Sequence, residues 1–196
     1  MLASKSGLLR SIQTRLERFY GLERSVDVRD FVREVADDQR ETLLVRESDD
    51  GVEVALLLPR RALEPHAALD ADTVLQVVEG VSHLVYLAER VRTRLPTTRL
   101  ELELQAEVDK FVLLALDRRD RFAEDHAALH EVLYERVRYL HDPSSEDGAR
   151  YRLANELASR YVRRFGPGAS DRALLAELRR FYRAGQAEKI RLARAA

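Results

Sequence analysis

The longest nearly continuous supply of core-forming residues runs from Thr73 to Leu116, and it constrains the fold more than any other stretch. Its first part carries valines at helical spacing, Val74, Val78, Val81 and Val85, and leucines widen this stripe over more than half of the circumference. A helix that is apolar over so much of its surface is covered on two sides. The stretch therefore predicts two antiparallel helices at the centre of a bundle.

Capping signals mark where these two helices begin. Thr73-Val-Leu-Gln76 and Thr98-Arg-Leu-Glu101 fit the pattern in which a hydroxyl and a side chain three residues later bind orphan backbone donors. Pro96 cannot continue the first helix and biases Leu95 away from helical geometry, so the turn is expected there. The alternation over 100–104 also fits a strand, but the helix propensity of Leu and Glu favours a helix.

The composition limits the classes of protein that fit this chain. Its 196 residues suit one domain that buries about 70% of its unfolded surface. Cysteine is absent, which excludes disulfides, thiolate catalysis and cysteine-ligated metals. No uncharged apolar run reaches 18 residues, and charge returns at Arg10, too early for a signal peptide. We therefore expect a cytoplasmic protein with no membrane partner.

Before the central stretch, the sequence predicts two helices. The first is amphipathic and ends at Gly21, with its apolar face formed by Leu8, Leu9, Ile12, Leu16, Phe19 and Tyr20. Ser25 is expected to cap a short second helix that uses Val28, Phe31, Val32 and Val35.

A β-hairpin is predicted over residues 41–58. Two alternating apolar runs, 41–47 and 52–58, flank Asp50-Gly51, and Asp-Gly in this position is a strong hairpin signal. One face is expected to hold Leu43, Val45, Val52, Val54, Leu56 and Leu58. Leu44 and Leu57 on the other face argue against an uncovered sheet. Because two strands alone are marginal in water, the hairpin must pack on helices, find a third strand or pair with another molecule.

Three longer helices are predicted after the central stretch. The first covers about 121–141 and buries Phe122, Leu129, Leu133, Val137 and Leu140. The second follows a break at 143–148, is capped by Ser144 with Asp147, and ends at Gly166-Pro167-Gly168. The third is capped by Ser170 and carries Leu174, Leu175, Leu178, Phe181 and Tyr182. Residues 186–196 are expected to fray, since only Ile190 and Leu192 can be buried.

Together these patterns predict a mainly α fold, a bundle of about six helices with one β-hairpin inserted at 41–58. A single domain over 1–196 is expected, with a possible division into a helix and hairpin region (1–66), central helices (67–142) and basic C-terminal helices (143–196).

Polar residues on the central helices form a candidate metal site. Glu79 and His83 lie on one face of the first helix, and Glu103 and Glu107 lie on one face of the second. If these faces meet, carboxylates and imidazole converge as in bundle metal sites. The chain lacks the Glu-x-x-His pairs of ferritin-type sites. The alternative is a solvated face held by ion pairs worth about 0.2–0.5 kcal/mol each.

Two further groups are candidates for binding. His126 and His130 have the spacing of metal ligands on a helix, but Ala127 stands where a zinc-protease motif needs Glu. Residues 150–196 hold 12 Arg or Lys against 4 Asp or Glu, so the first 149 residues carry a net charge of −9. A nucleic-acid surface is the functional interpretation of this basic end, with Arg160, Arg163, Arg164, Arg179, Arg180 and Arg183 as its residues. The alternative is docking on an acidic surface.

No phosphate-binding loop, nucleophile elbow or dinucleotide fingerprint occurs in the sequence, and no cofactor is expected. The leading functional hypothesis is a non-catalytic interaction protein, an adaptor or regulatory subunit whose partner is another protein or a second copy of itself. The alternatives are a nucleic-acid-associated protein and a helical protein with a carboxylate/His metal site.

Overall fold

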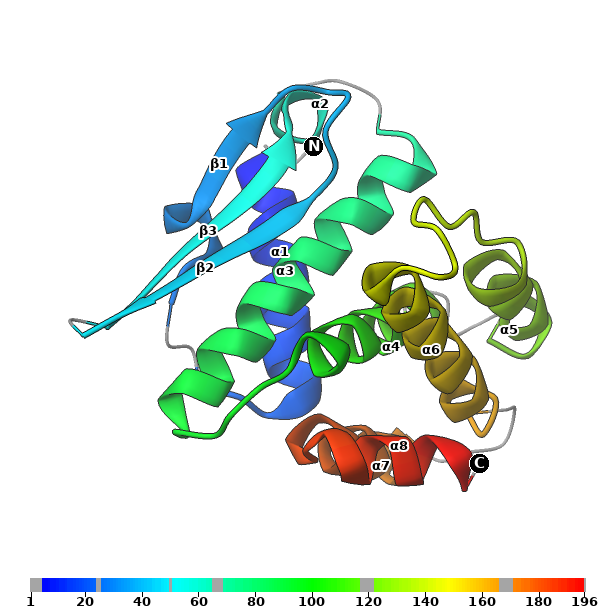
Figure 1. The fold of residues 1–196 in the computed structure, drawn as a ribbon. Coiled ribbons are helices and arrows are strands. Elements are labelled where there is room, and N and C mark those ends of the chain that lie inside the picture. Colours follow the sequence, from blue (N-terminus) through cyan, green and yellow to red (C-terminus); the bar gives the residue numbers. More distant parts are fainter. Residues whose placement is uncertain are drawn as a thin grey trace. The chain divides into compact units, whose positions relative to one another are not determined.

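The computed structural model describes residues 5–23, 26–49, 51–64, 69–116, 122–165 and 171–195. Helices dominate this part of the chain, and three strands form one small sheet (Figure 1). The helices are α1 (Lys5–Tyr20), α2 (Arg60–Leu63), α3 (Ala71–Arg92), α4 (Arg99–Leu116), α5 (Phe122–His130), α6 (Glu146–Val162), α7 (Asp171–Arg183) and α8 (Gln186–Arg194). The strands are β1 (Val32–Val35), β2 (Thr42–Ser48) and β3 (Gly51–Pro59). The predicted mainly α fold with an inserted hairpin is confirmed.

The chain forms two compact units. The first unit contains Met1–Arg18 and Leu22–Leu95, and the second contains Phe19–Gly21 and Pro96–Ala196. The boundary at Leu95 and Pro96 coincides with the turn predicted between the two long helices. Each of these helices serves the core of its own unit, α3 in the first and α4 in the second.

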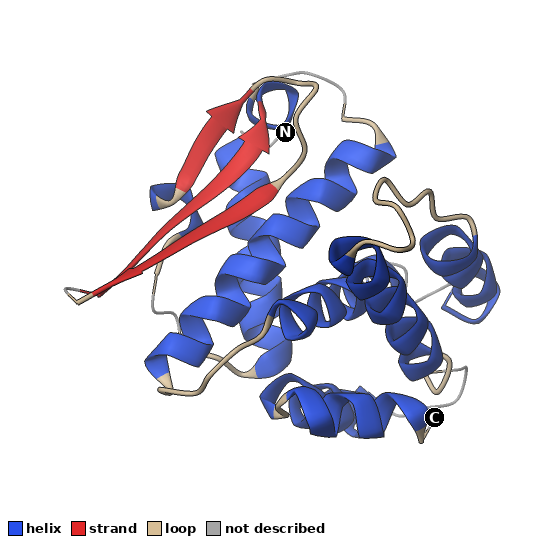
Figure 2. Cartoon of the chain, viewed as in Figure 1, coloured by secondary structure: helices blue, strands red, loops and turns tan. Residues whose placement is uncertain are grey.

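The sheet of the first unit has the order β1-β3-β2, with β3 parallel to β1 and antiparallel to β2. Strand β1 pairs only with Leu56–Pro59, so the β2–β3 hairpin extends past it, as the red strands in Figure 2 show. The hairpin prediction is confirmed, and it has found a third strand. The sheet face that carries Leu44 and Leu57 is less covered than expected, because Leu44 is 50% exposed.

The predicted second helix is wrong. A 3-10 turn at Val28–Asp30 is capped by Asp27, whose carboxylate accepts from the backbone N–H of Arg29 at 3.2 Å. The valines that follow form β1 and pair with β3. Four apolar residues fit a helix or a strand by periodicity alone, and pairing with a buried strand decides the outcome. The proposed cap, Ser25, lies outside the described residues.

Helix α3 packs on β3 and β2 and carries the core of the first unit. Leu56 and Leu58 are buried on the sheet face that shares Leu43, as the register requires. The helix begins earlier than predicted, because Asp70 caps it by accepting from the N–H of Thr73 at 2.7 Å. The cap predicted at Thr73 is therefore wrong.

The second unit is built on α4, which packs against α5, α6 and α8. The capping box that starts α4 is confirmed, since the N–H of Glu101 donates to Thr98 Oγ1 at 3.1 Å and the N–H of Thr98 donates to Glu101 Oε2 at 2.7 Å. Residues 100–104 are helical, which excludes the strand alternative.

Three predictions for the C-terminal part need correction. Helix α5 ends at His130 and continues as a π-helix over Glu131–Glu135, so Leu140 lies beyond it and is exposed. Helix α6 is capped by Ser145 in place of Ser144, because Ser144 bonds to Asp142. Its predicted end at 166–168 and the cap at Ser170 lie outside the described residues.

The C-terminal residues do not fray. They form α8, which buries Lys189, Leu192 and Ala193 against the rest of the second unit. Among the described helices, none has the length and apolarity needed to cross a bilayer.

Candidate functional site

Two of the predicted metal ligands lie together on α3. Glu79 and His83 occupy successive turns of the helix, and their ligand atoms approach within 4.8 Å. Glu79 is half-buried, and His83 is only 6% exposed. Burial makes this pair different from the solvated face that the sequence allowed as an alternative.

A third ionisable group, which sequence reasoning missed, contacts His83. The carboxylate oxygen Oε1 of Glu41 lies 3.4 Å from Nδ1 of His83, and both side chains are almost fully buried. Glu41 immediately precedes β2, so the turn into the hairpin carries its carboxylate to the helix. The sequence placed Glu41 only as the first residue of an alternating run.

The hairpin is held to α3 at this point by a chain of hydrogen bonds. The backbone N–H of Glu41 donates to Gln76 Oε1 at 3.1 Å. Gln76 Nε2 donates in turn to Asp72 Oδ2 at 2.7 Å, and Asp72 also pairs with Arg40 at 3.2 Å. These bonds fix where the Glu41 backbone sits along the helix.

Because Gly80 has no side chain, the Glu41 side chain can pack directly against α3. An ideal Cβ at this position would lie 2.8 Å from Glu41 Cγ and 2.6 Å from Leu56 Cδ1, which is closer than non-bonded carbons approach. A glycine inside a helix costs about 1 kcal/mol relative to alanine. Gly80 was the one sequence signal for this contact, because close approach of another element is what such a glycine permits.

We expect Gly80→Ala to destabilise the protein by about 1–2 kcal/mol. Overpacking of this kind costs about 1–3 kcal/mol, and the better helix propensity of alanine returns up to about 1 kcal/mol. Urea denaturation followed by circular dichroism measures the change. An increase in stability of about 1 kcal/mol would mean that propensity alone acts and that Leu56 and Glu41 move aside freely.

The other two predicted ligands lie on α4 in the second unit, where both have basic neighbours. Glu103 is buried with its Oε1 3.8 Å from Arg150 Nε, and Arg150 Nη1 also lies 2.7 Å from Asp147. Glu107 pairs with Lys110 at 2.6 Å. In their own unit these carboxylates take part in ion pairs.

His126 and His130 have separate surroundings. The ring of His126 meets Phe111 edge-on at 5.0 Å, and desolvation lowers the pKa of this imidazole. His130 Nε2 lies 3.0 Å from Ser159 Oγ and 3.2 Å from Arg163 Nε. Hydrogen-bonded and ring-packed histidines of this kind are the structural alternative to a metal pair.

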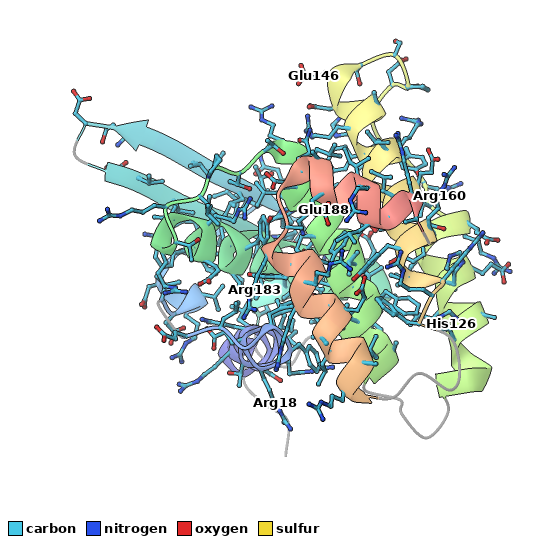
Figure 3. The ribbon with its side chains drawn as sticks, turned by 90° about the horizontal axis from the view of Figure 1, so that it is seen from below. Arg18, His126, Glu146, Arg160, Arg183 and Glu188 are labelled. Carbon is cyan, nitrogen blue, oxygen red and sulfur yellow. The ribbon has the colours of Figure 1, made fainter. Side chains whose placement is uncertain are left out.

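The arginines of the candidate nucleic-acid surface come from α6, α7 and the residues after α6. Figure 3 labels two of them, Arg160 on α6 and Arg183 on α7, which are well separated in that view. Several pair with carboxylates of the same unit: Arg160 with Glu156, Arg163 with Glu135, Arg164 with Glu177, and Arg180 with Glu177 and Glu188. Arg179 Nε donates to the carbonyl of Phe19 at 2.9 Å. These contacts support a structural role for the basic helices.

A buried polar network, which the sequence did not reveal, crosses the second unit. The hydroxyl of Tyr20 donates to Asp109, and Gln105 Nε2 donates to the same carboxylate at 2.8 Å. Lys189 Nζ donates to Gln105 Oε1, so an ammonium and a carboxylate are linked through one amide. Burial, reinforced by Asp109, holds the pKa of Tyr20 well above its usual value, so the phenol remains a donor.

Exposed apolar side chains gather on the β2–β3 hairpin. Leu44 is 50% exposed, and Val45 and Val52 are each 43% exposed. Among the described strands β2 pairs with β3 alone, so β2 is an edge of the sheet.

No protein family model matches this chain, and neither a curated protein nor a solved structure shows significant similarity to it.

Proposed function

We propose that the chain is a non-catalytic interaction protein that associates with a second copy of itself through the edge strand β2. The observation that carries this proposal is the exposure of Leu44 and Val45 on an edge strand of seven residues. An edge strand presents backbone N–H and C=O groups that can pair with another chain.

The composition of β2 supports this role. Natural sheet edges are usually blunted by charged side chains, above all Lys, by Pro, by bulges or by very short strands. β2 contains no Lys and no Pro, and its pairing with β3 is continuous from Thr42 to Ser48. The charged residues Arg46 and Glu47 lie toward the turn of the hairpin, so the apolar run from Leu43 to Val45 is the part of this edge that is suited to contact.

The pattern of side chains favours a symmetric partner. A twofold axis perpendicular to the sheet pairs residues that point to the same face, so an axis at Leu44 places Leu44 opposite its own copy and Leu43 opposite Val45. An axis at Arg46 would oppose two guanidinium groups, and like charges directly opposite are destabilising. Arg46 already forms an ion pair with Glu53 across the hairpin. Repulsion between the two Arg46 side chains therefore favours the register in which the twofold axis passes through Leu44.

Light scattering coupled to gel filtration tests the proposal. The wild-type protein should elute with twice the 22.5 kDa mass of one chain. Val45→Lys should give the monomer mass, because it places a charge in the contact on each copy. Val91→Lys is the matched control, since Val91 is 51% exposed near the C-terminal end of α3 and is not part of β2. A wild-type monomer at high concentration, or equal masses for the two variants, would refute the role of β2.

A further inference from the structure

Two carboxylates from different segments of the first unit lie beside one buried imidazole, that of His83. Glu41 reaches it from the start of the hairpin, and Glu79 reaches it from the preceding turn of α3. We propose that this cluster binds one divalent transition-metal ion, with Glu79 and His83 as ligands and Glu41 as the residue that orients His83.

The contact between His83 and Glu41 defines which ring nitrogen can bind a metal. With the imidazole neutral, a carboxylate beside Nδ1 favours the tautomer that carries its proton there. The lone pair then lies on Nε2. Metal-binding histidines commonly donate their other N–H to a carboxylate, which fixes the ring and raises its basicity.

Glu79 supplies an oxygen ligand from the same helix face. Residues four apart on a helix are neighbours, and the carboxylate of Glu79 lies within 4.8 Å of the His83 ligand atom. Water would complete the coordination, as it does in metal sites that keep an open position.

Charge within the cluster also favours a cation. The cluster places two carboxylates close to one imidazole. A dication neutralises both carboxylates at once. Gly80 allows the Glu41 carboxylate to lie close to α3, because a side chain at position 80 would displace it.

The ligand types select the class of metal. Imidazole with carboxylate suits Zn²⁺, Co²⁺ or Ni²⁺, whereas Mg²⁺ and Ca²⁺ prefer oxygen ligands. We therefore expect Zn²⁺ to bind more tightly than Mg²⁺. A buried ion pair without metal affinity would show no such preference.

Isothermal titration of untagged, chelator-treated full-length protein is the first test. Zn²⁺ should bind with one ion per chain, and Mg²⁺ should give no uptake under the same conditions. Absence of one-to-one Zn²⁺ uptake by the wild-type protein overturns the proposal.

Variants then assign the ligands. His83→Asn and Glu79→Gln should each abolish the one-to-one Zn²⁺ uptake, while His141→Asn, at an exposed histidine of the second unit, should leave it unchanged. If His83→Asn fails to fold by circular dichroism, the half-buried Glu79 provides the decisive variant. Uptake that survives Glu79→Gln contradicts the assignment.

Glu41 is tested separately because it acts through His83. Glu41→Gln should weaken Zn²⁺ binding about 10–100-fold, the range found for residues that orient a metal ligand. The visible spectrum of the Co²⁺-loaded protein should keep its shape in this variant, because the ligands are unchanged. Loss of the spectrum would make Glu41 a ligand, and an unchanged affinity would remove its positioning role.

Discussion

Replacement of Lys189 by Met is expected to lower the free energy of unfolding by about 3–5 kcal/mol, because it removes one partner of a buried charged network. Lys189 is fully buried, its ammonium lies 4.3 Å from the centre of the Phe181 ring, and it donates to Gln105. Met has a similar length but cannot donate a hydrogen bond. The change leaves the Asp109 carboxylate in the core without this neighbouring ammonium. Urea denaturation of the full chain measures the loss.

A matched control lies on the same helix. Arg191 is exposed and pairs with Glu188 at 2.6 Å, so Arg191→Met should leave the free energy of unfolding nearly unchanged. The double variant Lys189→Met with Asp109→Asn should recover part of the loss, since it removes both charges together. If Lys189→Met costs no more than Arg191→Met, the network does not contribute to stability as its burial implies.

Local signals in the sequence predicted most helices and the hairpin. The capping box at Thr98 and the Asp-Gly turn before Val52 act between residues a few positions apart. The spacing of apolar residues is also a local signal, and it predicted α1, α3, α4 and α7. The segment Val32–Val35 fitted both a helix and a strand by its local pattern. Pairing with the distant strand β3 makes it a strand, which local reasoning could not predict.

Features that depend on long-range contacts were not predictable from the sequence. Lys189 stands in a charged C-terminal segment, and only the packing of α8 on α4 and α6 shows that it is buried. The candidate metal site likewise has one part that the sequence predicts and one part that it does not. The pair of Glu79 and His83 follows from helical spacing, whereas Glu41 is 42 residues from His83 and reaches it only through the hairpin.

Gly148→Ala should destabilise the protein by about 2–3 kcal/mol, although alanine is the better helix former. Gly148 lies in the first turn of α6, and an ideal Cβ there would be 1.9 Å from the carbonyl oxygen of Asp142. Backbone cannot rotate away as a side chain can. The loop before the helix must therefore shift, and this loop carries the Ser145 cap, whose Oγ accepts from the Gly148 N–H at 3.0 Å.

A double-mutant cycle separates the two parts of this cost. Ser145→Ala alone should lose about 1 kcal/mol, the usual value of a helix cap. If the added methyl group displaces the loop and breaks the cap, then the double variant should be no less stable than Gly148→Ala. Additive losses would show that the cap survives and that the strain lies elsewhere in the loop. A gain in stability for Gly148→Ala would contradict the close approach of Asp142 altogether, because only an open site lets the propensity of alanine prevail.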